Sequence, residues 1–261
     1  MVEIISPNNP MIKEIASLKI RKNRWRTGLY TAEGFKIVWE AVNGGRAVEK
    51  LIFSDSIVNS EESEKLMSAF NNYRECIKVP SKIFTSISSM ESPQGVIAIL
   101  KIENNSLANL SADGNYIFLA GLQDPGNCGT IIRSAEAFNF KGIIFGQGSV
   151  DPFNQKAVQA SMGSILRTKL YFSDDDDKTL HLLKDKGFRL IATSLESNNK
   201  LSEFEFTNKD ILIIGNEGKG ISEKILSLSD IQITIPMGGE AESLNAGVAA
   251  SLMMYQTSLR P

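Results

Sequence analysis

The sequence predicts an α/β protein whose second part is a parallel sheet covered by helices on both faces. From residue 116 onward, apolar runs rich in β-branched residues alternate with stretches of helical periodicity. Glycine-rich loops follow three of these runs, at the strand ends where ligands of such sheets collect. The apolar and charged fractions, 42% and 22%, are those of an ordinary globular protein.

The first part, residues 1–105, is expected to form a smaller α/β domain. Apolar residues at helical spacing predict helices over residues 9–18, with Pro10 in the first turn, and 33–42, closed by Gly44 and Gly45. A polar helix is expected at residues 61–70 and strands at 48–54, 76–79 and 96–100. The polar, turn-rich stretch 103–114 is the best linker, so the second domain is expected to span residues 106–261.

Six strands are expected in this second domain, at residues 116–120, 142–146, 168–172, 188–194, 210–215 and 231–236. The acidic run 174–177 is interpreted as a solvated helix start, which the helix dipole favours. The sequence contains no internal repeats.

The composition excludes several kinds of chemistry. Cys76 and Cys128 are the only cysteines, which rules out a cysteine-based zinc site and argues against a disulfide framework. The single histidine, His181, lies in an amphipathic and exposed helix, and no second imidazole exists for a nucleophilic triad. No apolar run approaches the roughly 20 residues of a membrane span, and no signal peptide is recognisable. We expect a soluble cytoplasmic protein with no metal.

A basic segment near the N-terminus is a hypothetical RNA-binding surface, although the net charge of the chain is only −2. Clustered cations are the footprint of phosphate contacts, and Trp25 and Tyr30 among them can stack on exposed bases. A solvated helix face explains a basic run equally well. The cations of this segment are Lys13, Lys19, Arg21, Lys22, Arg24 and Arg26.

The first glycine-rich loop covers residues 122–133. Asp124, Pro125 and Gly126 are expected to form a turn, and Gly129 to open a helix. Arg133 would then lie one turn inside that helix, and its side chain would reach back over the helix N-terminus, where it could bind a phosphate or an acidic group. A surface ion pair is the alternative.

The second glycine-rich loop, residues 213–222, is neither a dinucleotide fingerprint nor a Walker loop. Its glycine spacing differs from the fingerprint, and Lys219 precedes Gly220 instead of following the last glycine. Its glycines still allow a ligand to approach the backbone closely, although a structural turn would explain them as well.

The third loop and the helix after it, residues 235–251, combine a proline, two glycines, an acid, a serine and an asparagine. Ser243 is expected to be the helix N-cap. Small residues at 246–251 leave one helix face thin, and we attribute this to tight packing of the fold or of a dimer.

The three loops, taken in order, resemble the motifs of the SpoU (TrmH-like) RNA 2′-O-ribose methyltransferases. The matching patterns are Asn127-x-Gly-x-x-x-Arg133, Gly215-Asn-Glu-Gly-x-Gly220 and Ile235-Pro-Met-x-Gly-x-x-Glu-Ser-Leu-Asn245. The segment 156–167 is also similar to that family. Ser6-x-x-Asn9-Pro10, Glu33-Gly34 and Ser92-Pro-Gln-Gly95 resemble its N-terminal substrate-binding domain.

The resemblance implies a trefoil-knotted methyltransferase domain at residues 106–261 and a ribosomal-protein-like RNA-binding domain at 1–105. It further implies S-adenosylmethionine as methyl donor, an RNA substrate (rRNA first, tRNA as the alternative) and a homodimer with the site near the subunit interface. A non-catalytic RNA-binding factor with this fold stays open as an alternative. A Rossmann oxidoreductase is disfavoured because residues 144–146 supply no phosphate loop after the strand.

Roles for single residues also follow from the resemblance. Arg133 is expected to contact the target ribose or its phosphate, and Glu217 to pair with Arg133. The catalytic set is Arg133, Asn127, Glu217, Asn245 and Ser243. The cofactor-binding set is Gly215, Gly218, Ile235, Met237, Gly239 and Leu244. The RNA-binding set is Lys19, Arg21, Lys22, Arg24 and Arg26. Cys128, inside the first motif, is interpreted as a packing residue and not a nucleophile.

Overall fold

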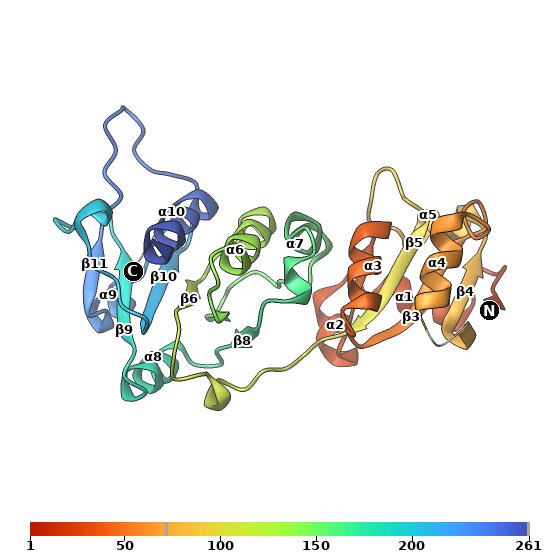
Figure 1. Cartoon of the computed structure of the whole chain (residues 1–261), viewed down its shortest axis with the longest axis horizontal. Coiled ribbons are helices and arrows are strands. Elements are labelled where there is room, and N and C mark those ends of the chain that lie inside the picture. Colours follow the sequence, from red (N-terminus) through yellow and green to blue (C-terminus); the bar gives the residue numbers. More distant parts are fainter. Residues whose placement is uncertain (71–72, 260–261) are drawn as a thin grey trace. The chain divides into compact units, whose positions relative to one another are not determined.

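The computed structural model describes residues 1–70 and 73–259 (Figure 1). Contacts divide the chain into two compact units. The first unit is Met1–Glu103 together with Phe153–Leu166, and the second is Asn104–Pro152 together with Arg167–Pro261. The chain thus leaves the second unit after Pro152, joins the first for fourteen residues and returns. The expected linear boundary at 105/106 does not include this excursion, which local sequence patterns do not reveal.

The first unit contains a five-stranded mixed sheet in the order β1-β4-β3-β5-β2. Strands β2 and β3 run antiparallel to β5, and the other pairs are parallel. Its elements are β1 (Val2–Glu3), α1 (Pro10–Ser17), α2 (Arg21–Thr27), β2 (Leu29–Glu33), α3 (Phe35–Asn43), β3 (Val48–Ser54), α4 (Glu61–Ala69), η1 (Tyr73–Glu75), β4 (Cys76–Val79), α5 (Ser81–Ile87), β5 (Val96–Lys101), α7 (Gln155–Ala160) and η3 (Ser164–Leu166).

The excursion lies against β2, which is an edge strand of this sheet. The Gln155 amide Nε2 donates to the Thr31 carbonyl at 2.7 Å, and Phe153 packs on the ring of Tyr30. An uncovered edge would present unpaired backbone groups to other chains. The segment 153–166 therefore completes the first unit.

The second unit contains a six-stranded sheet that is parallel, as expected, with the strand order β11-β9-β10-β6-β7-β8. Its elements are η2 (Leu107–Asn109), β6 (Tyr116–Ala120), α6 (Pro125–Ala137), β7 (Gly142–Phe145), β8 (Leu170–Phe172), α8 (Asp176–Asp185), β9 (Arg189–Thr193), η4 (Leu201–Glu203), β10 (Asp210–Gly215), α9 (Glu223–Leu228), β11 (Ile231–Ile233) and α10 (Ala246–Ser258).

Helices cover both faces of this sheet. Leu180 and Leu183 of α8 and Ile225 of α9 share one core with Phe118 and Ile213 of the sheet. Helices α6 and α10 pack on each other and contact β7 and β10. Because strand residues alternate between the faces, each strand contributes to both cores.

Single elements differ from their expected positions at the ends. Glu33 belongs to β2 and not to α3. Strand β11 ends at Ile233, after which the Thr234 N–H donates to the Asn199 carbonyl and the Thr234 carbonyl accepts from the Leu201 N–H. His181 is exposed on α8, and Asp175 caps that helix, as the acidic run predicts. No helix in the described part of the chain is long and apolar enough to cross a bilayer.

Candidate active site

Two of the glycine-rich loops leave neighbouring strands at the same edge of the second sheet. Strands β6 and β10 pair in parallel, and their last residues, Ala120 and Gly215, are register partners. The loops 121–124 and 216–220 therefore start side by side. This is the carboxyl edge of the sheet, where parallel α/β folds bind their ligands.

Glu217 joins these two loops. Its Oε1 accepts hydrogen bonds of 3.0 Å from the backbone N–H of Asp124 and from the side-chain amide of Asn127. Its Oε2 accepts a third, also 3.0 Å, from the backbone N–H of Gln123. Two residues predicted for the site, Asn127 and Glu217, are thus in direct contact although 90 positions separate them.

The electrostatics of Glu217 follow from these contacts. Partial burial raises its pKa, but the hydrogen bonds from Asn127, Asp124 and Gln123 outweigh that effect, and the pKa lies below its ordinary value. All three donors stabilise the ionised form. The positive end of the α6 dipole acts in the same direction. Glu217 is therefore an anion near neutral pH.

Asn216 organises the second loop and was missed by the sequence analysis. Its Oδ1 accepts from the N–H groups of Gly218 and Lys219, both at 2.9 Å, and its Nδ2 donates to the Gly121 carbonyl at 2.9 Å. It thereby folds its own loop and binds it to the end of β6. An asparagine at the start of a glycine-rich turn is the pattern that could have indicated this role.

Helix α6 begins earlier than predicted, and this moves Arg133. Asp124 is the N-cap, with its side chain accepting from the Asn127 N–H, and Pro125 occupies the first turn. The expected turn at 124–126 and helix start at Gly129 are therefore wrong. Arg133 lies more than two turns inside the helix, too far to reach back over its N-terminus.

Arg133 is exposed on the surface of α6. The expected pairing with Glu217 does not occur: the hydrogen bonds of Glu217 go to the α6 N-terminus, and Arg133 forms no salt bridge within residues 1–70 and 73–259. Its guanidinium is therefore available to a ligand.

Asn245, and not Ser243, caps α10. The Asn245 Oδ1 accepts from the N–H groups of Gly247 and Val248 at 2.9 and 3.2 Å. Ser243 is exposed in the preceding loop, so its expected capping role is wrong. The cap fixes Asn245 close to α6, because Gly247 packs against Thr130: a Cβ on Gly247 would lie 3.2 Å from that side chain.

The thin face of α10 packs within the unit. Gly247 and Ala250 are buried, α10 contacts α6, and the hydroxyls of Ser251 and Ser134 are 2.7 Å apart. Small residues allow the two helices to approach closely, which agrees with the packing explanation of the sequence pattern.

The connection between β11 and α10 stands out from the second unit in Figure 1. Ile235 and Met237 in it are half-buried, whereas Leu244 is 37% exposed. Gly238 and Gly239 have negative φ, and a Cβ on either would meet nothing within 4 Å. The fold of the chain therefore gives no steric reason for these two glycines, and space remains for a ligand against the backbone.

The other two predicted cofactor glycines are explained by the loop itself. A Cβ on Gly215 would lie 2.5 Å from the Gly220 carbonyl carbon, so only glycine fits there. The N–H of Gly218 already donates to Asn216 and is not available to a cofactor. Both residues shape the loop that borders the site.

Cys128 is buried, as its interpretation as a packing residue requires. Burial, and then the negative charges of Asp151 and Asp124, raise the pKa of its thiol far above the usual range. The thiolate that nucleophilic chemistry needs is therefore not formed near neutral pH. Groups of three or more metal-binding side chains are not found among the described residues.

The predicted RNA-binding residues separate into two groups in the first unit. Arg24 is 3% exposed, and its guanidinium donates to the carbonyls of Leu18 and Lys19 at 2.7 and 2.9 Å. It satisfies carbonyls at the end of α1, so a direct contact of Arg24 with RNA is excluded. The Lys19 ammonium binds the carbonyls of Ser86 and Ser88. Arg21, Lys22 and Arg26 are exposed.

Two of the predicted motifs of the first unit, Glu33-Gly34 and Ser92-Pro-Gln-Gly95, are in contact. The Gln94 Oε1 accepts from the Phe35 N–H at 3.1 Å and lies against Gly34, which has φ +109°. The Glu33 carboxylate is buried and accepts from the Ser89 N–H and the Ser88 hydroxyl. These contacts fix the segment before β5 onto the β2–α3 junction.

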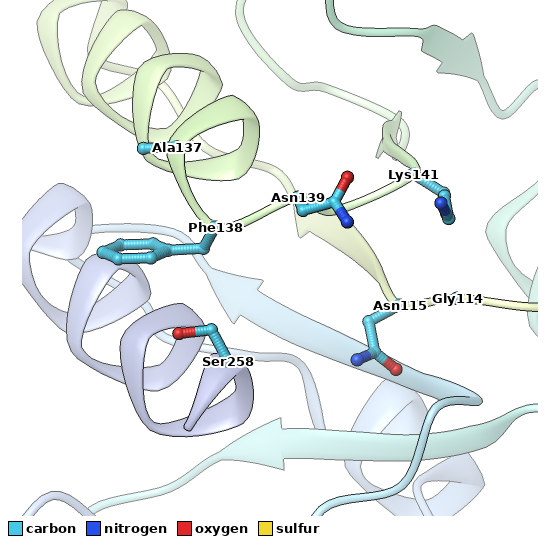
Figure 2. A pocket seen from close by; sticks show the side chains of 7 residues that line it. All are labelled: Gly114, Asn115, Ala137, Phe138, Asn139, Lys141 and Ser258. Carbon is cyan, nitrogen blue, oxygen red and sulfur yellow. The ribbon is translucent and has the colours of Figure 1, made fainter. Parts of the chain in front are cut away.

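A surface pocket of about 400 Å³ lies at the opposite edge of the second sheet (Figure 2). Its lining comes from the amino ends of β6 and β7 and from the carboxyl ends of α6 and α10. The residues are Gly114, Asn115, Ala137, Phe138, Asn139, Lys141 and Ser258. It contains none of the predicted site residues, so it is not the site defined by the three loops.

A parallel sheet with two interacting loops at its carboxyl edge and a separate α/β unit is an arrangement found in solved methyltransferases. The AdoMet-bound rRNA methyltransferase of Sinorhizobium meliloti matches with a TM-score of 0.88 at 27% identity, over 98% of this chain and 96% of that one. The SpoU methyltransferase AviRb of Streptomyces viridochromogenes, in complex with AdoMet, matches with a TM-score of 0.87 at 25% identity, over 96% and 97%.

Sequence comparison agrees with the structural likeness. The 23S rRNA (guanosine(2553)-2′-O)-methyltransferase RlmP of Bacillus subtilis is 28% identical over 98% of both chains. The SpoU rRNA Methylase family matches residues 114–255, and the MRM3-like substrate binding domain matches residues 9–98. The chain belongs to the SpoU rRNA methylase family and is a methyltransferase. The resemblance and the α/β fold are confirmed, while the trefoil knot stays a prediction.

Proposed function

We propose that the protein transfers a methyl group from S-adenosylmethionine to a ribose 2′-hydroxyl of RNA, with ribosomal RNA as the substrate. The observation that carries this proposal is the Glu217 contact with Asn127 and the α6 N-terminus, which brings two family motifs together at the carboxyl edge of the sheet. The likeness to the B. subtilis rRNA 2′-O-methyltransferase over nearly the whole chain supports the substrate class.

The residues at the sheet edge fit this cofactor. Ile235, Met237 and Leu244 offer apolar surface for an adenine, and Gly238 and Gly239 leave room for a group against the backbone. S-adenosylmethionine supplies an already activated methyl group. The protein therefore has to align the acceptor oxygen with that methyl and accommodate the proton that leaves.

The charge state of each side chain limits its role in the proton transfer. Arginine stays protonated in proteins, so Arg133 does not act as a base. Because it is exposed on α6 and too far along the helix to reach its N-terminus, we assign Arg133 to binding a ribose or phosphate that lies against the surface of α6. Glu217 is a weak base because its donors lower its pKa, and its oxygens are engaged in positioning Asn127. The proton then leaves to a substrate phosphate or to water.

Asn127 and Asn245 are expected to position the substrate. Nδ2 of Asn127 is held by Glu217, which directs its Oδ1 as an acceptor. Oδ1 of Asn245 is engaged in the helix cap, so its Nδ2 serves as a donor. One acceptor and one donor of fixed orientation suit a ribose with two hydroxyls.

We also propose a homodimer. Val248, Leu252, Tyr255 and Leu259 of α10 and its C-cap are between 40% and 55% exposed. Their spacing of four, three and four residues places them in one stripe along the helix. A second copy of the chain would cover this apolar stripe, which lies on the helix that Asn245 caps.

The test is a map of ribose methylation across rRNA and tRNA in a strain that lacks the gene. The proposal predicts that one rRNA 2′-O-methyl mark disappears and returns with the wild-type gene. An unchanged rRNA map with a missing tRNA mark would move the substrate to tRNA. An unchanged map for both would leave an RNA-binding factor without turnover. Light scattering of the purified protein tests the dimer, with Leu252→Glu as the variant expected to be monomeric.

A further inference from the structure

The exposed face of helix α2 consists of three cations and a tryptophan. Arg21, Lys22, Trp25 and Arg26 are its exposed residues. Successive helical residues are about 100° apart, so these four cover one arc of about 140°, in the angular order Arg21, Trp25, Lys22, Arg26. Trp25 therefore lies between two cations, and no acidic residue occurs in this helix.

The excursion from the second unit holds this tryptophan in place. Phe153 is buried and makes an edge contact with the Trp25 indole, with ring centroids 6.0 Å apart and an interplanar angle of 69°. Phe153 is fixed in turn by the Tyr30 ring at 4.8 Å. Trp25 nevertheless stays 37% exposed. Tyr30 is 4% exposed, so the sequence-based interpretation of Tyr30 as a second stacking residue is wrong.

We propose that Trp25 stacks on an unpaired base of the substrate RNA while Arg21, Lys22 and Arg26 contact the adjacent phosphates. A stationary aromatic ring loses little side-chain freedom when a base binds, because the contact with Phe153 already restricts it. Aromatic rings between cations are the arrangement that binds single-stranded nucleic acid, with the ring taking the base and the cations the backbone. This inference rests on the proposed RNA substrate and adds that Trp25 is the residue that stacks on an unpaired base.

Fluorescence tests the proposal directly. The chain has two tryptophans, Trp25 and Trp39, and Trp39 is 44% exposed on α3. Trp39→Phe leaves Trp25 as the only indole and is the matched control for losing an exposed tryptophan. Titration of Trp39→Phe with a short oligouridine is expected to quench the emission, and duplex RNA of the same length to quench it much less.

Binding measurements separate stacking from charge. Trp25→Leu is expected to weaken oligouridine binding about fivefold to 150-fold, about 1–3 kcal/mol, whereas Trp25→Phe retains most of the affinity. A plot of log affinity against log salt concentration has a negative slope. Its steepness should not change in Trp25→Leu, but should decrease by about 0.7 in Arg21→Gln, which loses one phosphate contact. Thermal unfolding and S-adenosylmethionine calorimetry of each variant verify that both units are folded.

The proposal would be overturned if Trp25→Leu and Trp25→Phe bound oligouridine with equal affinity and oligouridine did not quench the Trp25 emission. Quenching by polyglutamate but not by oligouridine would overturn it in favour of an acidic protein partner. Methyl transfer to rRNA by the wild-type enzyme is measured in parallel. If the wild-type enzyme methylates rRNA but RNA neither quenches Trp25 nor binds more weakly to Trp25→Leu, only this inference is refuted. If the wild-type enzyme does not methylate rRNA, the proposed function is refuted.

Discussion

The carboxylate of Glu217 accepts a hydrogen bond of 3.0 Å from the Asn127 side chain and also binds the backbone N–H groups of Gln123 and Asp124. A residue of the second motif thereby binds the residues at the start of the helix that carries the first motif. Because Asp124 caps this helix, two carboxylates lie at its N-terminus, where the helix dipole favours them. The position of Asn127 in the site depends on this contact.

Glu217→Gln should lower the methyl-transfer activity and should also lower the melting temperature at neutral pH. The folded-state pKa of Glu217 lies below the ordinary 4.5, so its ionisation stabilises the fold fully above pH 4.5, and this contribution is lost as the pH falls through the lowered value. Melting temperatures of the wild type and the variant should therefore differ at pH 7 and converge in acid. A constant difference across this range would show that the charge of Glu217 is not involved.

Arg24 and Arg26 should respond in opposite ways to alanine substitution. Arg24→Ala leaves buried carbonyls at the end of α1 without donors and should cost about 2–4 kcal/mol in urea unfolding. Arg26→Ala changes an exposed side chain, so its stability should stay within about 0.5 kcal/mol while RNA binding weakens. A stable Arg24→Ala protein with reduced RNA affinity would instead return Arg24 to the RNA-contacting set.

Gly215→Ala and Gly239→Ala form a second matched pair. The new Cβ at 215 would meet backbone at 2.5 Å and should destabilise the fold by about 1–3 kcal/mol. The Cβ at 239 meets nothing in the chain, so the melting temperature should be unchanged while S-adenosylmethionine binds more weakly in calorimetry. Wild-type affinity in Gly239→Ala would place the cofactor away from this loop.

The thiols should be inert in the folded enzyme. Burial raises the pKa of Cys76 to about 11 and that of Cys128 further still. A thiol reagent at pH 8 should therefore label both residues only after denaturation, and Cys128→Ala should retain its methyl transfer. Rapid labelling of the native protein, with loss of activity in that variant, would identify Cys128 as a reactive group.

Local patterns predicted four strands with their exact bounds and missed two others. The bounds of β3, β4, β6 and β10 agree with the expected ranges because these runs are largely apolar, whereas β1 and β2 were not predicted. The start of α6 was missed because Asp-Pro-Gly is as typical of a turn as of a capped first turn. The three motifs predicted the family, since their order along the chain is specific to it.

Long-range contacts could not be predicted in the same way. Nothing near Arg24 in the sequence distinguishes it from Arg26; only the position of the α1 carbonyls makes one a structural residue. The pairing of Asn127 with Glu217 and the packing of Phe153 against Trp25 join residues about 90 and 130 positions apart. The roles of Asn216 and Asn245 likewise depend on which N–H groups surround their side chains.

The central claim is methyl transfer to a ribose oxygen, and one measurement tests it most directly. The purified enzyme is incubated with methyl-labelled S-adenosylmethionine and rRNA from the deletion strain, and the product is hydrolysed in alkali. A 2′-O-methyl group protects the adjacent phosphodiester, so the label should appear in an alkali-stable dinucleotide and be lost with Arg133→Ala. Label in mononucleotides, which indicates base methylation, or no transfer at all would contradict the account.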